Sequence, residues 1–307
     1  MIRRHRTTVL VALTAALALS ACGGGGNPLA EDEPQDGGSD GASAGGDTLV
    51  IGSANFPENV LLAEIYAAAL GDAGVDVETN LNIGNREAYM AGLEDGSIDL
   101  IPEYTGNLTL FLNEDAEATA SDEVYAELQE ALPENLTVLD MAEAEDKDSV
   151  VVTAETAEKL GLTTIADLKP EAPNLVLGGP PEWRDRFTGV PGLQEVYGLE
   201  FSEFKPLDAG STLTVQALVN GQIDAGNIFS TDPAIVENDF VVLEDNESLF
   251  AAQNVVPLIS TDAVTPEIEE ALNGVSAGLT TQNLTDMMVQ VQDGDPAAVA
   301  REFVDGL

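Results

Sequence analysis

The chain has 307 residues, of which 55 are acidic and 11 basic, and its formal net charge at pH 7 is −44. A chain this acidic repels phosphate backbones, which excludes nucleic-acid binding. The only histidine is His5 and the only cysteine is Cys22. An intramolecular disulfide is therefore impossible, and the main part of the chain holds neither a Ser-His-Asp triad nor a histidine-ligated zinc. We interpret the acidity as a solvated surface and expect no metal, no cofactor and no catalysis.

The N-terminus has the pattern of an export signal. Arginines at positions 3, 4 and 6 precede the apolar run VLVALTAALAL, which is too short for a comfortable membrane span. The run ends in LSAC, which resembles the lipobox of bacterial lipoproteins, where cleavage leaves the cysteine as the lipidated first residue. We expect a signal peptide at 1–21, lipid attachment at Cys22 and a flexible Gly/Ser-rich acidic tether at 22–47. The protein would then sit lipid-anchored on the extracytoplasmic face of the cell membrane.

From Thr48 onward, short apolar strands alternate with amphipathic helices. This alternation predicts an α/β fold with largely parallel sheets that helices cover on both faces. Pro257 inside the last strand predicts an edge or crossover segment. In chain order we expect strands at 48–53, 75–81, 98–101, 149–153, 174–177, 223–228, 240–243 and 255–260, and helices at 57–70, 86–93, 123–132, 154–160, 191–197, 213–219, 266–279, 283–291 and 296–304.

One short pattern occurs twice. GSIDLIPEYTG (96–106) and GQIDAGNIFST (221–231) both contain Gly-x-Ile-Asp, then four residues, then an aromatic, Tyr104 or Phe229. Turn-forming residues follow each aromatic, so both are expected at strand ends. Ligands of open α/β sheets bind beyond the carboxyl ends of the strands. The repeat predicts two similar sheets whose aromatics face each other across one cleft.

Several blocks in this order resemble one known family, the substrate-binding proteins of osmoprotectant ABC transporters for glycine betaine, choline or carnitine. The blocks are IGSANFPENVLLAEIYAAAL, IGNRE, GSIDLIPEYTGNL, AETAEKLGLTTIADL, GGPPEWRDRFTGVPGLQEVYGLEF, VQALVNGQIDAGNIFSTD and QNVVPLIS. The resemblance implies a type II periplasmic-binding-protein fold with two α/β lobes that close around a ligand. Lobe I would comprise 48–148 and 254–307, and lobe II 149–253. It also implies a monomer that delivers its solute to an ABC permease.

The resemblance further implies an aromatic cage that holds a quaternary ammonium group by cation–π attraction. Tyr104 and Phe229 fall on cage tyrosines, whereas Asp148 and Gln253 stand where two further tyrosines are usual. Asn107 falls on a position that is often threonine, and Arg186 falls on the arginine that takes the ligand carboxylate.

Other candidates rest on the residues themselves. Arg186 is suited to bidentate carboxylate binding, or else forms a surface salt bridge. Asn55 lies between a strand and the helix that starts at Pro57, where it could reach a ligand. Trp183 either lines the cleft or packs beneath it, and Arg86 is expected to hold a carboxylate. The tyrosines at 66, 89, 125 and 197 are expected to pack.

The ligand stays open between two classes. The predicted ligand-binding residues are Asn55, Tyr104, Asn107, Asp148, Arg186, Phe229 and Gln253. The resemblance favours a quaternary ammonium osmoprotectant. The incomplete cage, with its polar Asp148 and Gln253, leaves open another small polar or zwitterionic solute, such as an amino acid.

Overall fold

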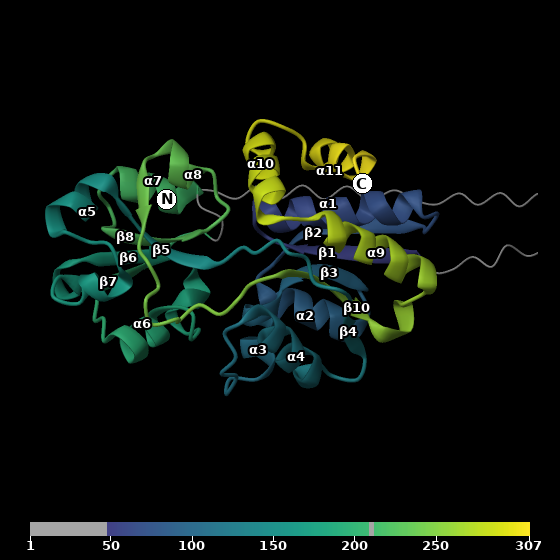
Figure 1. Ribbon diagram of the computed structural model, residues 1–307, viewed down its shortest axis with the longest axis horizontal. Helices are drawn as coiled ribbons and strands as arrows, with labels where there is room; N and C mark the ends of the chain where they lie inside the picture. The colour runs from purple at the N-terminus through teal and green to yellow at the C-terminus, as the bar shows by residue number, and fades with distance from the viewer. Residues whose placement is uncertain (1–47, 209–211) are drawn as a thin grey trace, which may run out of the picture. The chain divides into compact units, whose positions relative to one another are not determined.

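The computed structural model describes residues 48–208 and 212–307, which contain two five-stranded sheets (Figure 1). The predicted signal peptide, the lipid-attachment residue Cys22 and the tether lie outside the described residues. Among those that are described, no helix combines the length and the apolar character needed to cross a membrane. The two sheets confirm the α/β class and the pair of similar sheets that the repeat predicts.

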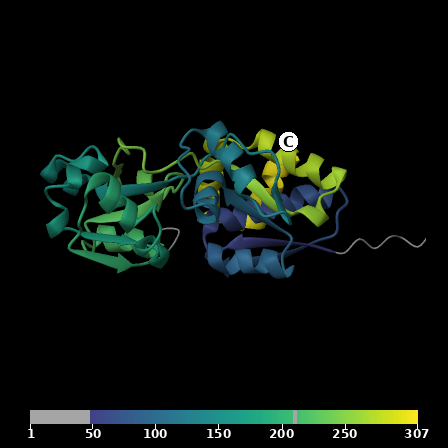
Figure 2. The same ribbon diagram turned by 90° about the horizontal axis from the view of Figure 1, so that it is seen from below.

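The first sheet has the strand order β2-β1-β3-β10-β4, and helices cover both of its faces. Figure 2 shows the C-terminal helices, drawn in yellow, beside the N-terminal segment in purple. One face packs against α1 and the three C-terminal helices, and the other against α2, α3 and α4. The strands are β1 (Leu49–Ala54), β2 (Val77–Gly84), β3 (Leu100–Tyr104), β4 (Leu136–Val138) and β10 (Val255–Ser260). The helices are α1 (Pro57–Asp72), α2 (Arg86–Asp95), α3 (Thr105–Leu112), α4 (Ser121–Ala131), α9 (Pro266–Gly278), α10 (Thr281–Val291) and α11 (Pro296–Asp305).

The second sheet has the order β7-β6-β8-β5-β9, which repeats the arrangement of the first. Helices α5 and α6 contribute to the apolar cluster on one face, and α7 and α8 to the cluster on the other. The strands are β5 (Asp148–Thr153), β6 (Val176–Gly179), β7 (Glu203–Pro206), β8 (Ala225–Phe229) and β9 (Phe240–Val242). The helices are α5 (Ala154–Leu160), α6 (Val190–Tyr197), α7 (Thr212–Val219) and α8 (Ala234–Glu237).

Four of the five strands in each sheet run in the same direction, as the prediction of largely parallel sheets expects, but one strand in each runs against them, so both sheets are mixed. Strand β10 runs antiparallel to β3 and β4, and β5 runs antiparallel to β8 and β9. These two strands directly follow the segments in which the chain passes from one sheet to the other. Each therefore enters its sheet from the side at which the neighbouring strands end.

Pro257 does not lie in an edge strand, since β10 pairs with strands on both sides. Toward β3 it stands opposite Pro102. Neither proline has a backbone N–H, so this pair of residues makes no hydrogen bond for which a donor would be missing. Its carbonyl accepts from the Leu139 amide, 3.1 Å away and just past the end of β4. The missing N–H of Pro257 therefore coincides with the end of the ladder, which explains a proline in an interior strand.

Four of the helices and strands in the described residues were not predicted from the sequence. Strands β4 and β7 have three and four residues, and α8 has four. Helix α3 starts at Thr105 with no intervening turn, because Tyr104 ends β3 and is also the N-cap of α3. The sequence signals for these elements are short or shared with a neighbour.

The Gly-x-Ile-Asp repeat performs the same structural task in both sheets. The Asp99 carboxylate accepts from the Val50 amide at 2.8 Å, and the Asp99 amide donates to the Val50 carbonyl at 2.8 Å. Asp224 makes the same pair with Val176, at 2.8 and 2.9 Å. The glycine that opens each repeat has a positive φ, 74° and 63°, which favours glycine. Each repeat thus ends a helix and anchors the next strand to its parallel neighbour.

A buried ion pair fixes α2 against β3. The Arg86 guanidinium donates from Nε and Nη2 to the two carboxylate oxygens of Glu103, both at 2.7 Å. The Glu103 side chain has no exposed surface, and that of Arg86 is 7 % exposed. The Tyr89 hydroxyl and the Tyr104 amide also donate to Glu103, at 2.6 and 3.0 Å. The expectation that Arg86 holds a carboxylate is confirmed.

Replacing Arg86 by alanine should lower the free energy of unfolding by about 3–5 kcal/mol, because it leaves the buried Glu103 carboxylate without its cation. Urea denaturation measures the change. Arg301→Ala is the matched control: Arg301 also donates to both oxygens of a carboxylate, that of Asp72, but this pair is exposed and should contribute little. Equal destabilisation by the two variants would contradict the structural role of the buried pair.

Candidate functional site

A small cavity lies where the carboxyl ends of β3 and β8 meet the start of β5. The volume open to the centre of a water molecule is about 60 Å³, enough for a few water molecules. Side chains from both sheets line it, which fits a small solute. The predicted site residues that line this cavity are Asn55, Tyr104, Asn107, Asp148, Arg186 and Phe229.

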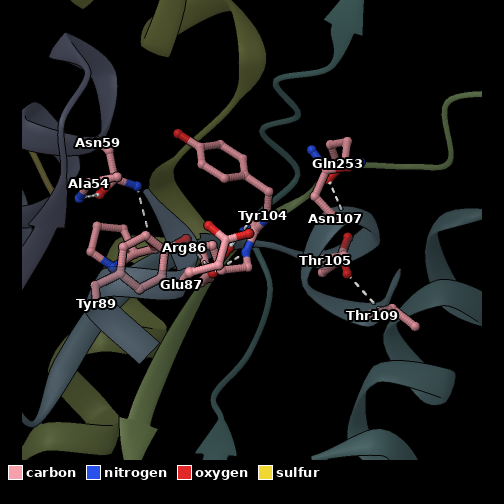
Figure 3. Close-up of polar contacts among 12 residues, drawn as sticks. Ala54, Asn59, Arg86, Glu87, Tyr89, Tyr104, Thr105, Asn107, Thr109 and Gln253 are labelled. Carbon is pink, nitrogen blue, oxygen red and sulfur yellow. Dashed lines mark hydrogen bonds and ion pairs between the residues drawn. The ribbon is translucent and has the colours of Figure 1, made fainter. Parts of the chain in front are cut away.

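Gln253 is the one predicted site residue that does not line the cavity. It is fully buried, and its side-chain oxygen accepts from the Asn107 amide at 3.0 Å. Figure 3 shows Gln253 beside Asn107 at the start of α3. Gln253 therefore supports a lining residue from behind.

Three aromatic rings from both sheets lie together at the cavity. Tyr104 and Phe229 are the last residues of β3 and β8, as predicted. The ring of Phe56 lies between them, with its centroid 6.1 Å from that of Tyr104 and 5.2 Å from that of Phe229. Sequence reasoning missed Phe56, although it lies two residues after the end of β1 and directly before the proline that opens α1, which is also a position just past a strand end. Apolar π faces of this kind attract cations.

Two further aromatics line the cavity. Trp183 is buried, with its ring stacked on that of Phe250 at 6.4 Å between centroids. Tyr89, expected only to pack, is buried but also lines the cavity and donates to Glu103. Arg184 lies outside, with its guanidinium carbon 5.5 Å from the centre of the Phe204 ring.

Asp148 provides a buried carboxylate at the cavity wall. It stands opposite Phe229 in the β5–β8 pairing, so the two side chains share one face. Its oxygens accept from the side-chain amides of Asn107 at 3.0 Å and Asn227 at 2.9 Å. Burial raises the pKa of Asp148, while these two amide donors and the more distant Arg186 and Arg86 act to lower it. The hydrogen-bond partners of this carboxylate are thus neutral amides.

The two arginines at the cavity already have carboxylate partners. Arg86 is engaged by the buried Glu103. Arg186 donates from Nη2 to both oxygens of Glu87, at 3.1 and 3.0 Å, and these side chains are 27 % and 51 % exposed. The second pair joins α2 of the first sheet to the segment after β6 of the second. Such a partly exposed pair is weak enough for a competing carboxylate to replace Glu87.

The described residues contain no group of three or more histidine, cysteine, aspartate or glutamate side chains placed to hold a metal ion. What the cavity offers is three neighbouring π faces, the two buried carboxyl groups of Asp146 and Asp148, and several amides. This arrangement can bind a small cation or zwitterion.

Comparisons with known proteins agree with this geometry. Residues 47–306 match the family model described as the substrate binding domain of ABC-type glycine betaine transport system. A glycine-betaine-binding protein of Pseudomonas aeruginosa is 28 % identical over 277 residues, covering 84 % of this chain and 87 % of the relative. A carnitine transport binding protein, OpuCC, of Listeria monocytogenes is 25 % identical, covering 84 % and 86 %.

Solved structures show the same fold. The crystal structure of a glycine betaine/carnitine/choline ABC transporter protein has a TM-score of 0.67 at 21 % identity, covering 84 % of this chain and 98 % of that one. Lactococcal OpuAC, in its closed form with glycine betaine, has a TM-score of 0.61 at 16 % identity, covering 84 % and 95 %. These likenesses confirm the two-lobe periplasmic-binding-protein fold. The chain therefore belongs to the family of substrate-binding domains of ABC-type glycine betaine transport systems.

Proposed function

We propose that this protein captures a quaternary ammonium osmoprotectant, of the glycine betaine or choline type, in the cavity between its lobes. It then delivers the solute to the permease of an ABC importer and performs no catalysis. The observation that carries the proposal is the group formed by Phe56, Tyr104 and Phe229 beside the Asp148 carboxylate. A trimethylammonium group has no N–H to donate, so π faces and a nearby negative charge are the means of holding it.

The proposal gives each predicted residue a role. Tyr104, Phe229 and the added Phe56 face the ammonium group, and each desolvated face contributes about 1–2 kcal/mol. Asp148 supplies negative charge, while Asn55, and Asn107 braced by Gln253, provide polar contacts. Arg186 exchanges Glu87 for the carboxylate of a betaine.

The remaining assignments complete the proposal. Lobe I comprises 48–147 and 254–307, and lobe II comprises 148–253, one residue earlier than expected from the sequence because Asp148 pairs within the second sheet. The protein is a monomer, tethered by residues 22–47 to a lipid on Cys22, at the extracytoplasmic face of the membrane. The LSAC motif and the composition of the segment after it support this.

Calorimetric titration of the purified protein with glycine betaine, choline, carnitine and proline betaine should give saturable binding of at least one. Phe229→Ala should weaken that binding about tenfold, because it removes one π face. Phe111→Ala is the matched control, since Phe111 is 38 % exposed and lies outside the cavity. A parallel titration with amino acids tests the alternative. Binding of an amino acid without binding of any quaternary ammonium compound would favour the amino-acid-like ligand. Equal effects of the two phenylalanine variants would contradict the cage.

Choline affinity should fall as the pH is lowered from neutral towards the range in which the Asp148 carboxyl takes up a proton. Burial raises the pKa of Asp148, so its carboxyl takes up a proton at a higher pH than an exposed aspartate does. The protonated group no longer attracts the cation. Asp148→Asn should bind choline more weakly, with a flatter pH profile in the same calorimetric assay. An unchanged pH profile in this variant would show that Asp148 does not provide the charge.

A further inference from the structure

The Glu58 carboxylate connects the two lobes directly behind the aromatic cage. Glu58 lies in the first turn of α1, is 2 % exposed and does not line the cavity. One of its oxygens accepts from the Tyr104 hydroxyl at 2.8 Å, within the lobe of the first sheet. The other accepts from the Thr231 hydroxyl, which follows β8 in the lobe of the second sheet. A single carboxylate thus contacts both lobes.

The surroundings of Glu58 suit a hydrogen-bond acceptor. Burial raises its pKa, whereas hydrogen bonds with Thr231, Tyr104 and Asp146 act to lower it. Burial, and next the charge of Glu58, raise the pKa of Asp146 well above its usual value. The N-terminal turn of α1 also favours negative charge. Glu58 thus accepts from two hydroxyl donors, one in each lobe.

The segment that contains Thr231 is also tied to the passage between the sheets. The Thr231 amide donates to Asp146 at 3.1 Å, and the Ser230 hydroxyl donates to the same oxygen at 3.2 Å. Asp146 precedes β5 and lies between the two sheets along the chain. The Thr231–Glu58 bond, in contrast, requires this segment to lie against α1. It therefore joins the second lobe to α1 of the first.

We infer that Glu58 is a positioning residue that couples the orientation of the Tyr104 ring to closure of the two lobes around the solute, with the Thr231 hydroxyl as the closing donor. This inference rests on the proposed function. The bond restrains the Tyr104 ring from the side opposite the ligand. The same carboxylate then holds the second lobe in place, so loss of the Thr231 donor should speed ligand release and leave capture unchanged.

The test compares Thr231→Val, which keeps the shape and removes the hydroxyl, with Thr231→Ser, which keeps the hydroxyl. Trp183 is the only tryptophan and lines the cavity, so stopped-flow fluorescence with glycine betaine and with choline reports association and dissociation. Thr231→Val should raise the dissociation rate about tenfold or more, the effect of losing one hydrogen bond to a charged group. The association rate should change less than about twofold, and Thr231→Ser should restore slow release.

The matched control is Thr109→Val. Thr109 is also buried, but its hydroxyl donates at 2.7 Å to the Thr105 carbonyl within α3 (Figure 3). It should leave the dissociation rate unchanged. A Thr231→Val protein that releases ligand like the wild type, a Thr231→Ser protein that behaves like Thr231→Val, or an equal effect of Thr109→Val would overturn the inference. Absence of any binding by the wild type would overturn the proposed function and this inference with it.

A double-mutant cycle gives an independent outcome. Tyr104→Phe keeps the ring and removes the other hydroxyl that Glu58 accepts. Because both donors act through one carboxylate, the combined effect of Tyr104→Phe and Thr231→Val on dissociation should be smaller than the product of the single effects. Independent, multiplicative effects would show that Glu58 does not couple the ring to the second lobe.

Discussion

The cleft depends first on one buried charge. Glu103 has no exposed surface, and a carboxylate that deep must be paired and hydrogen-bonded. Arg86 supplies the cation and thereby fixes the start of α2 against β3. The Glu103 carboxylate also accepts hydrogen bonds from the Tyr89 hydroxyl and the Tyr104 amide. This buried ion pair thus sets the position of two cavity residues.

The buried carboxyl groups at and near the cavity lower the stability of the protein without its ligand. Burial raises the pKa values of Glu58, Asp146 and Asp148. A carboxyl whose pKa is higher in the folded than in the unfolded state costs stability at pH values above that pKa, and the cost shrinks as the pH falls through it. In a chain with a net charge of −44, few cations remain to offset this cost. A bound cationic group would offset it, so the charge that disfavours the empty cleft favours the proposed ligand.

Sequence reasoning located what depends on local pattern. Strand ends, turn residues and a repeated motif were enough to place Tyr104 and Phe229 at one cavity. Contacts between distant segments had no such signal: Glu58 meets Tyr104 across 46 positions and Thr231 across 173. Strand direction was also hidden, because apolar runs look alike in parallel and antiparallel strands. Phe56 could have been found by the strand-end argument, whereas the supporting position of Gln253 behind Asn107 depends on tertiary packing.

The repeat explains both the likeness and the difference of the two lobes. Asp99 and Asp224 anchor equivalent strands in the same way, so each sheet presents an aromatic at the equivalent strand end. The strand that pairs with that end differs. In the first sheet Val255 stands opposite Tyr104, and in the second Asp148 stands opposite Phe229. One lobe therefore places an apolar residue beside its aromatic and the other a carboxylate, so the carboxylate of Asp148 lies at the Phe229 side of the cavity, where it can orient a cation.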